Sequence, residues 1–190
     1  MSIKYIMIHH TAVSYTKNSD QFNANNNYHK AQWNFKSSLG YYLGYNYEIA
    51  KNGRVRQARK DGETTAACYQ NNMNDGRAIH IALDGNFDSE KPTPEQIYAL
   101  RDLMRKLVSQ YGIKESDIIF HRDHAAKTCP GNNVEIGFIR SLAFPVPTPT
   151  ITPEPVIVPG IPTSVNTEKE DIKREIALLL SKISSLIEKI

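Results

Sequence analysis

Two stretches of the sequence carry side chains that can bind a metal ion. His121 follows a short apolar run, and Cys129 stands eight residues later, directly before a Pro-Gly pair. Imidazole nitrogen and thiolate sulfur are ligands that Zn²⁺ prefers in proteins. A third ligand must come from elsewhere, and His9 and His10 end the first apolar run of the chain. Two histidines and one cysteine leave a fourth position open for water, as a catalytic zinc site requires. The alternative is a surface-loop cysteine with unrelated histidines, and spacing alone does not separate the two.

The elements that would position these residues alternate between strand and helix. Short β-branched apolar runs predict strands over 3–8, 45–49, 78–83 and 117–120, and an Asn-Gly turn at 52–53 predicts a hairpin to a strand at Val55. Helices are expected over 19–33, 93–112 and 134–143. The second of these should begin at Thr93, with Pro94 at its first position and Gln96 completing a capping box. This order predicts an α/β domain with a central mixed β-sheet flanked by helices.

Proline divides the chain into a block and a tail. Seven of the ten prolines lie between residues 145 and 162, and proline removes an amide donor and restricts φ. We therefore expect a domain over 1–144, an extended Pro-rich linker over 145–163 and a separate segment over 164–190. The alternative for the linker is a strand-like arm lying along the domain.

The segment 164–190 has the pattern of an amphipathic helix. Apolar residues recur in steps of four and three at positions 172, 176, 179, 183, 186 and 190, which is heptad spacing. A helix of this length is marginal alone in water, so its apolar face needs a cover. A second copy of the chain, in a coiled coil, is favoured over packing on the 1–144 block and over contact with a membrane surface.

Composition excludes several classes of protein. Hydrophobic residues make up 40% of the 190 and charged residues 23%, which is a globular balance. A net charge of +3 is far from the excess expected of a nucleic-acid-binding protein. The N-terminus reads as a first strand rather than a signal peptide. The cysteines Cys68 and Cys129 are too few for a disulfide framework, so either they pair once or at least one thiol has a chemical role.

Four segments carry a resemblance to a known family. They are 6–12 (IMIHHTA), 43–49 (LGYNYEI), 84–87 (DGNF) and 121–131 (HRDHAAKTCPG). In order and spacing they resemble the zinc-dependent N-acetylmuramoyl-L-alanine amidases of the type 2 amidase and peptidoglycan-recognition-protein superfamily, which includes many phage endolysins. The resemblance covers essentially all of 1–144, and the linker and tail lie outside it.

The resemblance implies a zinc site and a reaction. It makes His9, His121 and Cys129 the zinc ligands. Tyr45 matches the family's catalytic tyrosine, and Lys127 matches a position that some amidases fill with lysine and others with threonine. The implied reaction is hydrolysis, by zinc-activated water, of the amide between N-acetylmuramic acid and the L-alanine of the stem peptide. Tyr45 would hold the water or a substrate oxygen, and Lys127 would stabilise the oxyanion.

Three positions depart from the family's pattern. The run that ends at Cys68 replaces a segment in which relatives often carry a pocket histidine, and Cys68 is expected to be a small buried residue. His80 stands in a strand where relatives commonly have glycine, and a solvent-facing histidine is favoured over a neighbour of the site. The segment 34–42 is longer than usual, so Tyr41 or Tyr42 competes with Tyr45 for the catalytic role.

Other polar residues near these motifs receive supporting roles. His29 matches a helical position of the family and is interpreted as structural. Asp123 and His124 are candidates for orienting a ligand imidazole, because metal-bound histidines need a hydrogen-bond partner. His10 takes the more variable place beside the ligand. Glu48 lies on the opposite strand face from Tyr45 and is not expected to be catalytic.

The predicted function is that of a peptidoglycan hydrolase of the phage-endolysin type, with Zn²⁺ as cofactor and bacterial peptidoglycan as partner. It would be made in the cytoplasm and act on the cell wall after release, causing lysis. One alternative is a cytosolic amidase that recycles soluble muropeptides. Another is a peptidoglycan-binding protein without catalysis, although such proteins commonly lack the cysteine present here as Cys129. Homo-oligomerisation or membrane contact is expected only through the tail.

Overall fold

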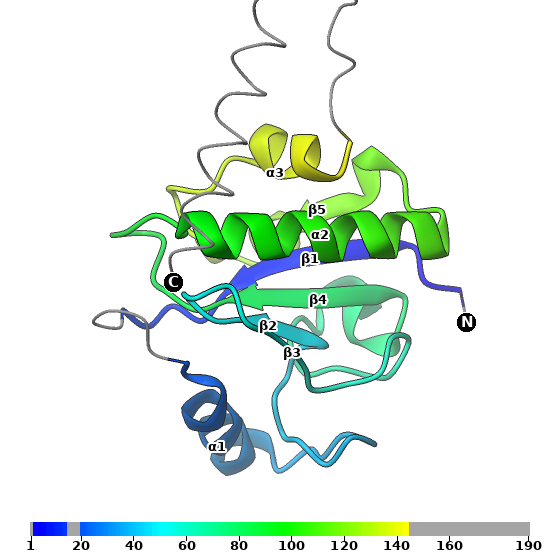
Figure 1. The fold of residues 1–190 in the computed structure, drawn as a ribbon. Helices are drawn as coiled ribbons and strands as arrows, with labels where there is room; N and C mark the ends of the chain where they lie inside the picture. The colour runs from blue at the N-terminus through cyan, green and yellow to red at the C-terminus, as the bar shows by residue number, and fades with distance from the viewer. Residues whose placement is uncertain (1, 15–19, 145–190) are drawn as a thin grey trace, which may run out of the picture. The chain divides into compact units, whose positions relative to one another are not determined.

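A five-stranded mixed sheet runs through the computed structural model, which describes residues 2–14 and 20–144 (Figure 1). The strands are β1 (Tyr5–His10), β2 (Tyr47–Ile49), β3 (Val55–Gln57), β4 (Ala78–Leu83) and β5 (Ile118–Phe120), in the order β3-β2-β4-β1-β5. Only β3 is antiparallel to its neighbour; the other strand pairs are parallel. The predicted α/β class and mixed sheet are confirmed. The predicted linker 145–163 and helix 164–190 lie outside the described residues.

The helices are α1 (Phe22–Trp33), α2 (Pro94–Tyr111) and α3 (Ile136–Ala143), with short 3₁₀ turns η1 (Gln70–Asp75), η2 (Glu115–Asp117) and η3 (His121–Asp123). α2 has the predicted capping box and ends at Gly112, whose left-handed φ of 65° suits glycine. The first and third helices begin slightly later than predicted. None of the helices in the described ranges is long and apolar enough to cross a membrane.

One face of the sheet forms the main hydrophobic core under α2 and α3. Its residues alternate along the strands with those of the opposite face, as the period of two requires. Ile6 and Ile8 of β1 and Ile79 and Ile81 of β4 are all fully buried there, packed with side chains such as Leu103 of α2. Burying one such side chain contributes about 1.5–3 kcal/mol. This face anchors the strands and leaves the other face available for polar side chains.

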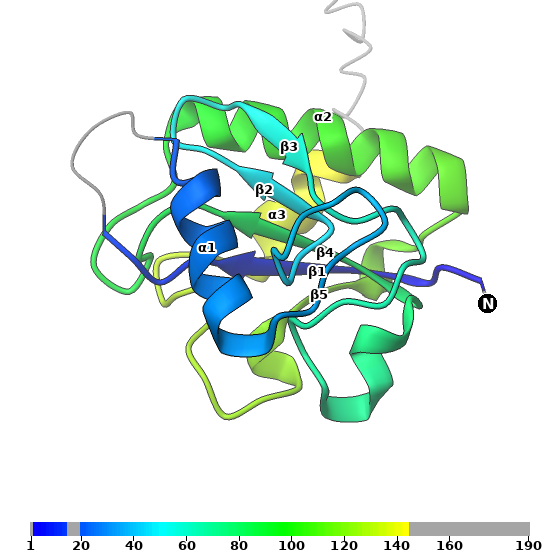
Figure 2. The ribbon, with the colours of Figure 1, turned by 90° about the horizontal axis from the view of Figure 1, so that it is seen from below.

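The opposite face carries the polar and small residues of the same strands. Met7 and His9 of β1 point to this side together with His80 of β4, and these three side chains are at most 1% exposed. Figure 2 shows α1 near the carboxyl end of β1 and η1 towards the other end. The prediction that His80 faces solvent is wrong. β4 lies between β2 and β1, and Met73 of η1 covers this face, so the strand is buried on both sides.

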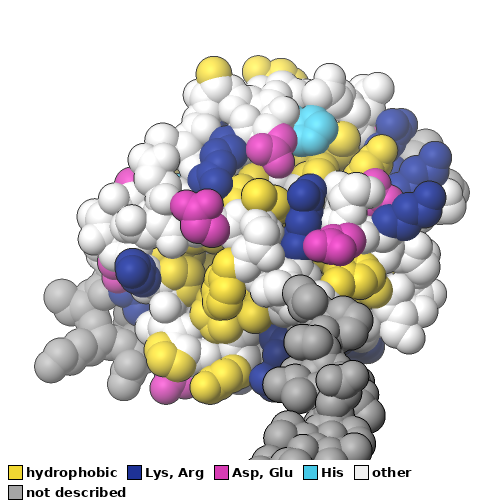
Figure 3. All heavy atoms as spheres, turned by 90° about the horizontal axis from the view of Figure 1, so that it is seen from above, with side chains coloured by type: hydrophobic (Ala, Val, Ile, Leu, Met, Phe, Trp, Pro, Cys, Tyr) yellow, Lys and Arg dark blue, Asp and Glu magenta, His cyan; other side chains and the backbone are white. Residues whose placement is uncertain are grey.

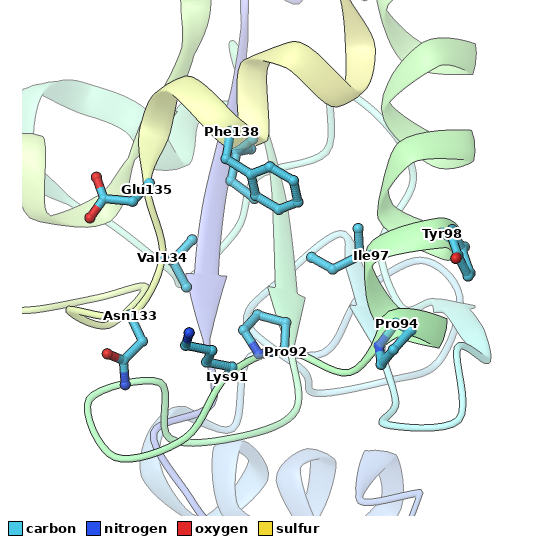
Figure 4. Close-up of a pocket in the computed structure, with 10 residues that line it drawn as sticks. Lys91, Pro92, Pro94, Ile97, Tyr98, Asn133, Val134, Glu135 and Phe138 are labelled. Atoms are coloured by element: carbon cyan, nitrogen blue, oxygen red, sulfur yellow. The ribbon is translucent and has the colours of Figure 1, made fainter.

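The outer side of α2 and α3 has a separate apolar hollow of about 430 Å³. Figure 3, seen from the α3 side, shows hydrophobic side chains gathered there between charged ones. Phe138 of α3 and Ile97 of α2 lie on its two sides, with Val134 and Pro92 between them (Figure 4). None of the residues predicted to bind metal or substrate lines it.

Candidate active site

His9, His121 and Cys129 meet at the carboxyl ends of two neighbouring strands. His9 lies near the end of β1, His121 directly follows β5, and Cys129 lies on the loop after η3. One ligand atom from each residue lies within 4.8 Å of the others, and all three residues are buried. The His9 Nδ1 and Cys129 Sγ atoms are 3.7 Å apart, and the two imidazole centroids are 4.7 Å apart. The carboxyl edge of parallel strands is where α/β folds place binding sites.

The first histidine of the pair, not the second, joins this cluster. His10 alternates to the other face of β1, where its Nδ1 accepts a hydrogen bond from the Phe87 backbone N–H at 3.2 Å. Its own backbone N–H donates to the Cys129 Sγ at 3.5 Å. The backbone of His10 therefore helps to position the Cys129 sulfur, while the His10 ring packs near Phe87.

The loop that carries Cys129 is held to η3 by Arg122. The Arg122 backbone N–H donates to the Cys129 carbonyl at 2.8 Å. Its guanidinium donates to the Gly131 carbonyl at 2.8 Å and to the Val134 carbonyl at 2.9 Å. Since Arg122 directly follows His121, the same residue sets both predicted ligands relative to each other.

Asp88 holds the same loop from the other side. Its carboxylate accepts from the Thr128 hydroxyl at 2.6 Å and from the Asn132 backbone N–H at 2.9 Å, and these hydrogen bonds lower the pKa of Asp88. Gly131 has a φ of +108°, and a Cβ there would lie 2.4 Å from the Phe87 carbonyl carbon. Only glycine allows the loop to approach Phe87 this closely.

The electrostatics of the three residues suit a divalent cation with nitrogen and sulfur ligands. Burial, followed by the neighbouring His80 and His121, lowers the pKa of His9 well below its ordinary value. Burial and the charge of Lys127 lower the pKa of His121 to about 4, so both imidazoles are neutral and keep a lone pair. Burial raises the pKa of the Cys129 thiol to about 12, so metal binding there must release its proton. This donor set fits Zn²⁺.

Tyr45 lies beside the cluster at the entrance to β2. Its ring centroid is 5.1 Å from that of His9. Burial raises the pKa of the Tyr45 phenol far above its ordinary value, so the hydroxyl stays a hydrogen-bond donor. Tyr41 instead packs edge-on against Phe22, and Tyr42 lies under the ammonium of Lys30.

His29 of α1 positions the segment that carries Tyr45. Its Nδ1 accepts a hydrogen bond from the Gly44 backbone N–H at 3.0 Å, and burial lowers its pKa to about 4. Its ring lies 5.5 Å from that of Tyr45 and 4.6 Å from that of Trp33. These contacts agree with the structural interpretation of His29.

Lys127 is exposed on the loop before Cys129. Its positive charge contributes to the lowered pKa values of His9 and His121, and it opposes the raised pKa values of Cys68 and Cys129. The ammonium group is therefore close enough to act electrostatically on the cluster.

Asp123 and His124 have partners other than a ligand imidazole. The Asp123 carboxylate accepts from the Phe120 backbone N–H at 2.8 Å, and His124 Nδ1 pairs with the Asn71 side-chain amide at 2.8 Å. The side chain that does contact a predicted ligand is His80, at 2.9 Å from His9. The expected exposure of His80 to solvent is therefore wrong; its place between Ala78 and Ala82 in an apolar strand is the sequence signal of burial on both faces.

A buried pair of carboxyl groups adjoins the site, and the sequence did not predict that they lie together. Glu48 of β2 is 2% exposed and Asp84 is fully buried. Asn25 of α1 donates to both, at 3.0 and 3.2 Å. Burial raises the pKa of Asp84 to about 6 and that of Glu48 well above its ordinary value, and their mutual repulsion adds to the rise at Glu48. Among the described residues, Glu48 Oε1 has no hydrogen-bond donor.

A groove of about 460 Å³ opens next to Tyr45. One wall is the loop after β1 and the other is α1; the lining residues are Thr11, Ala12, Val13, Ala24, Asn25, Tyr28, His29 and Tyr45. Since Tyr45 also contacts His9, the groove leads towards the histidine–cysteine cluster. It is the candidate substrate-binding surface.

Both cysteines are free and buried, so they do not form a disulfide. Cys68 is 2% exposed and packs with Met7, Met73 and Ala78 on the polar face of the sheet. The prediction that Cys68 is a small buried residue is confirmed.

Known proteins resemble this chain in sequence and in fold. Residues 1–132 match the family described as N-acetylmuramoyl-L-alanine amidase. Peptidoglycan-recognition protein SC2 of Drosophila melanogaster is 31% identical over 134 residues, which cover 70% of each protein. The structure of N-acetylmuramoyl-L-alanine amidase LysC from Clostridium intestinale URNW is 28% identical, with a TM-score of 0.59 and coverage of 74% of this chain and 84% of that chain. Endolysine N-acetylmuramoyl-L-alanine amidase LysCS from the same organism has the same identity and TM-score, with coverage of 74% and 82%.

Proposed function

The chain belongs to the family of N-acetylmuramoyl-L-alanine amidases, and we propose that it hydrolyses the amide between N-acetylmuramic acid and the L-alanine of the peptidoglycan stem peptide. The observation that carries this proposal is the convergence of His9, His121 and Cys129, all buried, beside Tyr45 and an open groove. Zinc bound by these three residues would polarise the scissile carbonyl and lower the pKa of water towards about 7.

The chain's own residues would do the remaining work. The protonated Tyr45 hydroxyl can donate a hydrogen bond to the oxygen at the reacting carbon, because its raised pKa prevents ionisation. The Lys127 ammonium can balance the negative charge that develops on that oxygen. The groove between the loop after β1 and α1 would hold the substrate so that the scissile amide lies next to Tyr45.

The biological role we propose is bacterial lysis by an endolysin made in the cytoplasm and acting on the cell wall after release. In support, LysCS is named an endolysine amidase, and the structural match covers 82% of its chain. The second candidate function is binding of peptidoglycan without hydrolysis, because some relatives are named peptidoglycan-recognition proteins. The observation that favours hydrolysis over binding alone is the presence of Cys129 with both histidines in one cluster.

The test is mass spectrometry of the products released from purified sacculi, by zinc-loaded and by chelated protein. Stem peptides with a free L-alanine amine, released only with zinc, are the expected result. Cys129→Ser should abolish both release and zinc binding, because serine is a poor zinc ligand at neutral pH. Cys68→Ser replaces the other buried free cysteine and is the matched control, which should keep both.

Other outcomes of these measurements would indicate a different function. Release from soluble anhydro-muropeptides but not from sacculi would indicate the recycling amidase. Binding to sacculi with no released peptide, in a protein that holds zinc, would indicate the recognition role. Full activity of Cys129→Ser would remove the cysteine from the site.

A further inference from the structure

A chain of three contacts leads from the backbone of η1 to the Cys129 sulfur. The His80 Nε2 atom lies 2.9 Å from the Met73 carbonyl oxygen. The His80 Nδ1 atom lies 2.9 Å from His9 Nε2. The other nitrogen of His9, Nδ1, lies 3.7 Å from Cys129 Sγ. His80 is fully buried and His9 is 1% exposed, so water does not compete for these nitrogens.

The donor and acceptor roles in this chain follow from one fixed group. A carbonyl oxygen can only accept, so His80 Nε2 must carry the proton. A fully buried imidazole is neutral and has one N–H, so His80 Nδ1 is an acceptor. His9 Nε2 must then donate to it, which leaves His9 Nδ1 unprotonated on the side of Cys129. The Met73 carbonyl therefore decides, through His80, which nitrogen of His9 is free.

We propose that His80 is a positioning residue that holds His9 in the Nε2–H tautomer, with the Nδ1 lone pair directed at the zinc site before the metal arrives. The inference rests on the proposed function only in naming the metal. A ligand imidazole needs a partner on its second nitrogen to set its tautomer and ring orientation, and losing such a partner typically costs 10–100-fold in metal affinity. Here a second histidine supplies what a carboxylate or carbonyl supplies elsewhere.

Two features show why His80 suits this position. β1 and β4 are parallel neighbours with Met7 opposite His80, so His80 lies one step diagonally from His9 on the same face. The residues on either side of His80 along that face are Ala78 and Ala82, which leave room for an imidazole. Asp123 and His124, the residues predicted to orient a ligand imidazole, contact other groups.

The direct test is long-range ¹H–¹⁵N NMR of the metal-free protein with ¹⁵N-labelled histidine. The ring nitrogens of His9 and His80 should both report the neutral Nε2–H tautomer at pH 7. A His9 that carries its proton on Nδ1 would overturn the proposal, whatever the protein does with zinc.

Two substitutions separate hydrogen bonding from space filling. His80→Gln keeps an acceptor for His9 and a donor for the Met73 carbonyl, so its zinc dissociation constant, measured by competition with a chelator, should stay within about threefold of the native value. His80→Phe keeps a ring and removes both roles, so its zinc dissociation constant should rise about 10–100-fold. The His9 ring nitrogens should at the same time show a mixture of tautomers.

The results distinguish this inference from the proposed function. A native protein that binds no zinc would refute the zinc amidase and leave the tautomer result standing. Native zinc affinity and an unchanged His9 tautomer in His80→Phe would refute the positioning role and leave the amidase standing. If circular dichroism shows that His80→Phe does not fold, the tautomers of the native protein and the zinc affinity of His80→Gln still test the proposal. A zinc dissociation constant that is tenfold or more above the native value in His80→Gln would refute it.

Discussion

At the scale of single residues, the site combines buried side chains that can bind a metal ion with an exposed lysine at its edge. The three predicted ligands are buried and carry no charge before metal binds, whereas the Lys127 side chain is exposed. A positive group at the rim can act on charge that develops during the reaction without competing for the metal.

Lys127→Ala should therefore lower turnover by about 10²-fold while zinc content stays native, because an electrostatic stabiliser of the oxyanion is removed. The measurements are the rate of peptide release from sacculi and zinc by atomic absorption. Lys106→Ala, on the exposed side of α2, is the control and should leave both unchanged. An unchanged rate of peptide release for Lys127→Ala would show that Lys127 does not stabilise the oxyanion.

Site residues whose roles follow from their neighbours along the chain are predictable from the sequence, whereas those whose roles follow from distant contacts are not. His9, His121 and Cys129 follow apolar runs or precede a Pro-Gly pair, and the structure brings all three together. His80 was misread because its burial depends on η1 and on strands far away in the sequence. The pairing of Glu48 with Asp84 was not predicted for the same reason, since it depends on α1, which brings Asn25 to both.

At the scale of elements, the boundaries that proved predictable have local chemical causes. The start of α2 is set by Thr93 and Gln96, which satisfy each other's backbone N–H groups, and Gly112 ends the helix. α1 has no side-chain cap, and its residues lack a strong apolar stripe, so its start was less well defined. Its packing depends instead on contacts such as that of Phe22 with Leu43 and Ala58.

Thr93→Ala should lower the free energy of unfolding by about 1–2 kcal/mol, because an N-cap hydroxyl is lost. The same hydroxyl also donates to the Lys51 carbonyl at 2.7 Å, which places the substitution at the upper end of that range. Urea denaturation is the measurement. Ser109→Ala, within the last turns of the same helix, is the control and should change the value by less than about 0.5 kcal/mol.

The loop between His121 and Val134 provides a test of how an element controls the site. Arg122→Lys keeps the charge but cannot reach two carbonyls in the fork geometry of a guanidinium. We expect a loss of about 1.5–3 kcal/mol in unfolding free energy and weaker zinc binding, because the Cys129 loop is released. Isothermal titration with zinc and urea denaturation check these two results.

Arg105→Lys is the control for that experiment. Arg105 is exposed and donates to one carbonyl, that of Leu142, between α2 and α3. The Arg105→Lys variant should lose less unfolding free energy than Arg122→Lys and should bind zinc with native affinity. Equal loss of zinc affinity in both variants would show that the loop does not depend on Arg122.

At the scale of the whole molecule, the sequence predicts that residues 164–190 determine assembly. That segment lies outside the described residues, so its heptad pattern remains a prediction. Deleting 164–190 should lower the particle mass measured by light scattering. A monomeric mass for both the full chain and the truncated chain would exclude the coiled coil.

The buried carboxyl pair makes the stability of the whole domain depend on pH. Glu48 and Asp84 have raised pKa values when folded, so the folded protein keeps protons that the unfolded chain has already lost. Because the unfolded state binds fewer protons, the unfolding free energy falls as pH rises from about 4 through about 6, where Asp84 ionises, and it goes on falling until Glu48 has ionised as well. The stabilising protonated pair is fully present only below the unfolded pKa values.

Glu48→Gln should remove most of this dependence, since a neutral amide can still accept the hydrogen bond from Asn25. Relative to the native protein, the variant should gain about 1–2 kcal/mol of unfolding free energy at pH 8 and much less at pH 5. Urea denaturation at pH 5, 6.5 and 8 measures the difference. Glu115→Gln, an exposed carboxylate in η2, should follow the native curve. A native protein whose stability rises from pH 5 to pH 8 by the same amount as Glu48→Gln would show that the pair is not strained by ionisation.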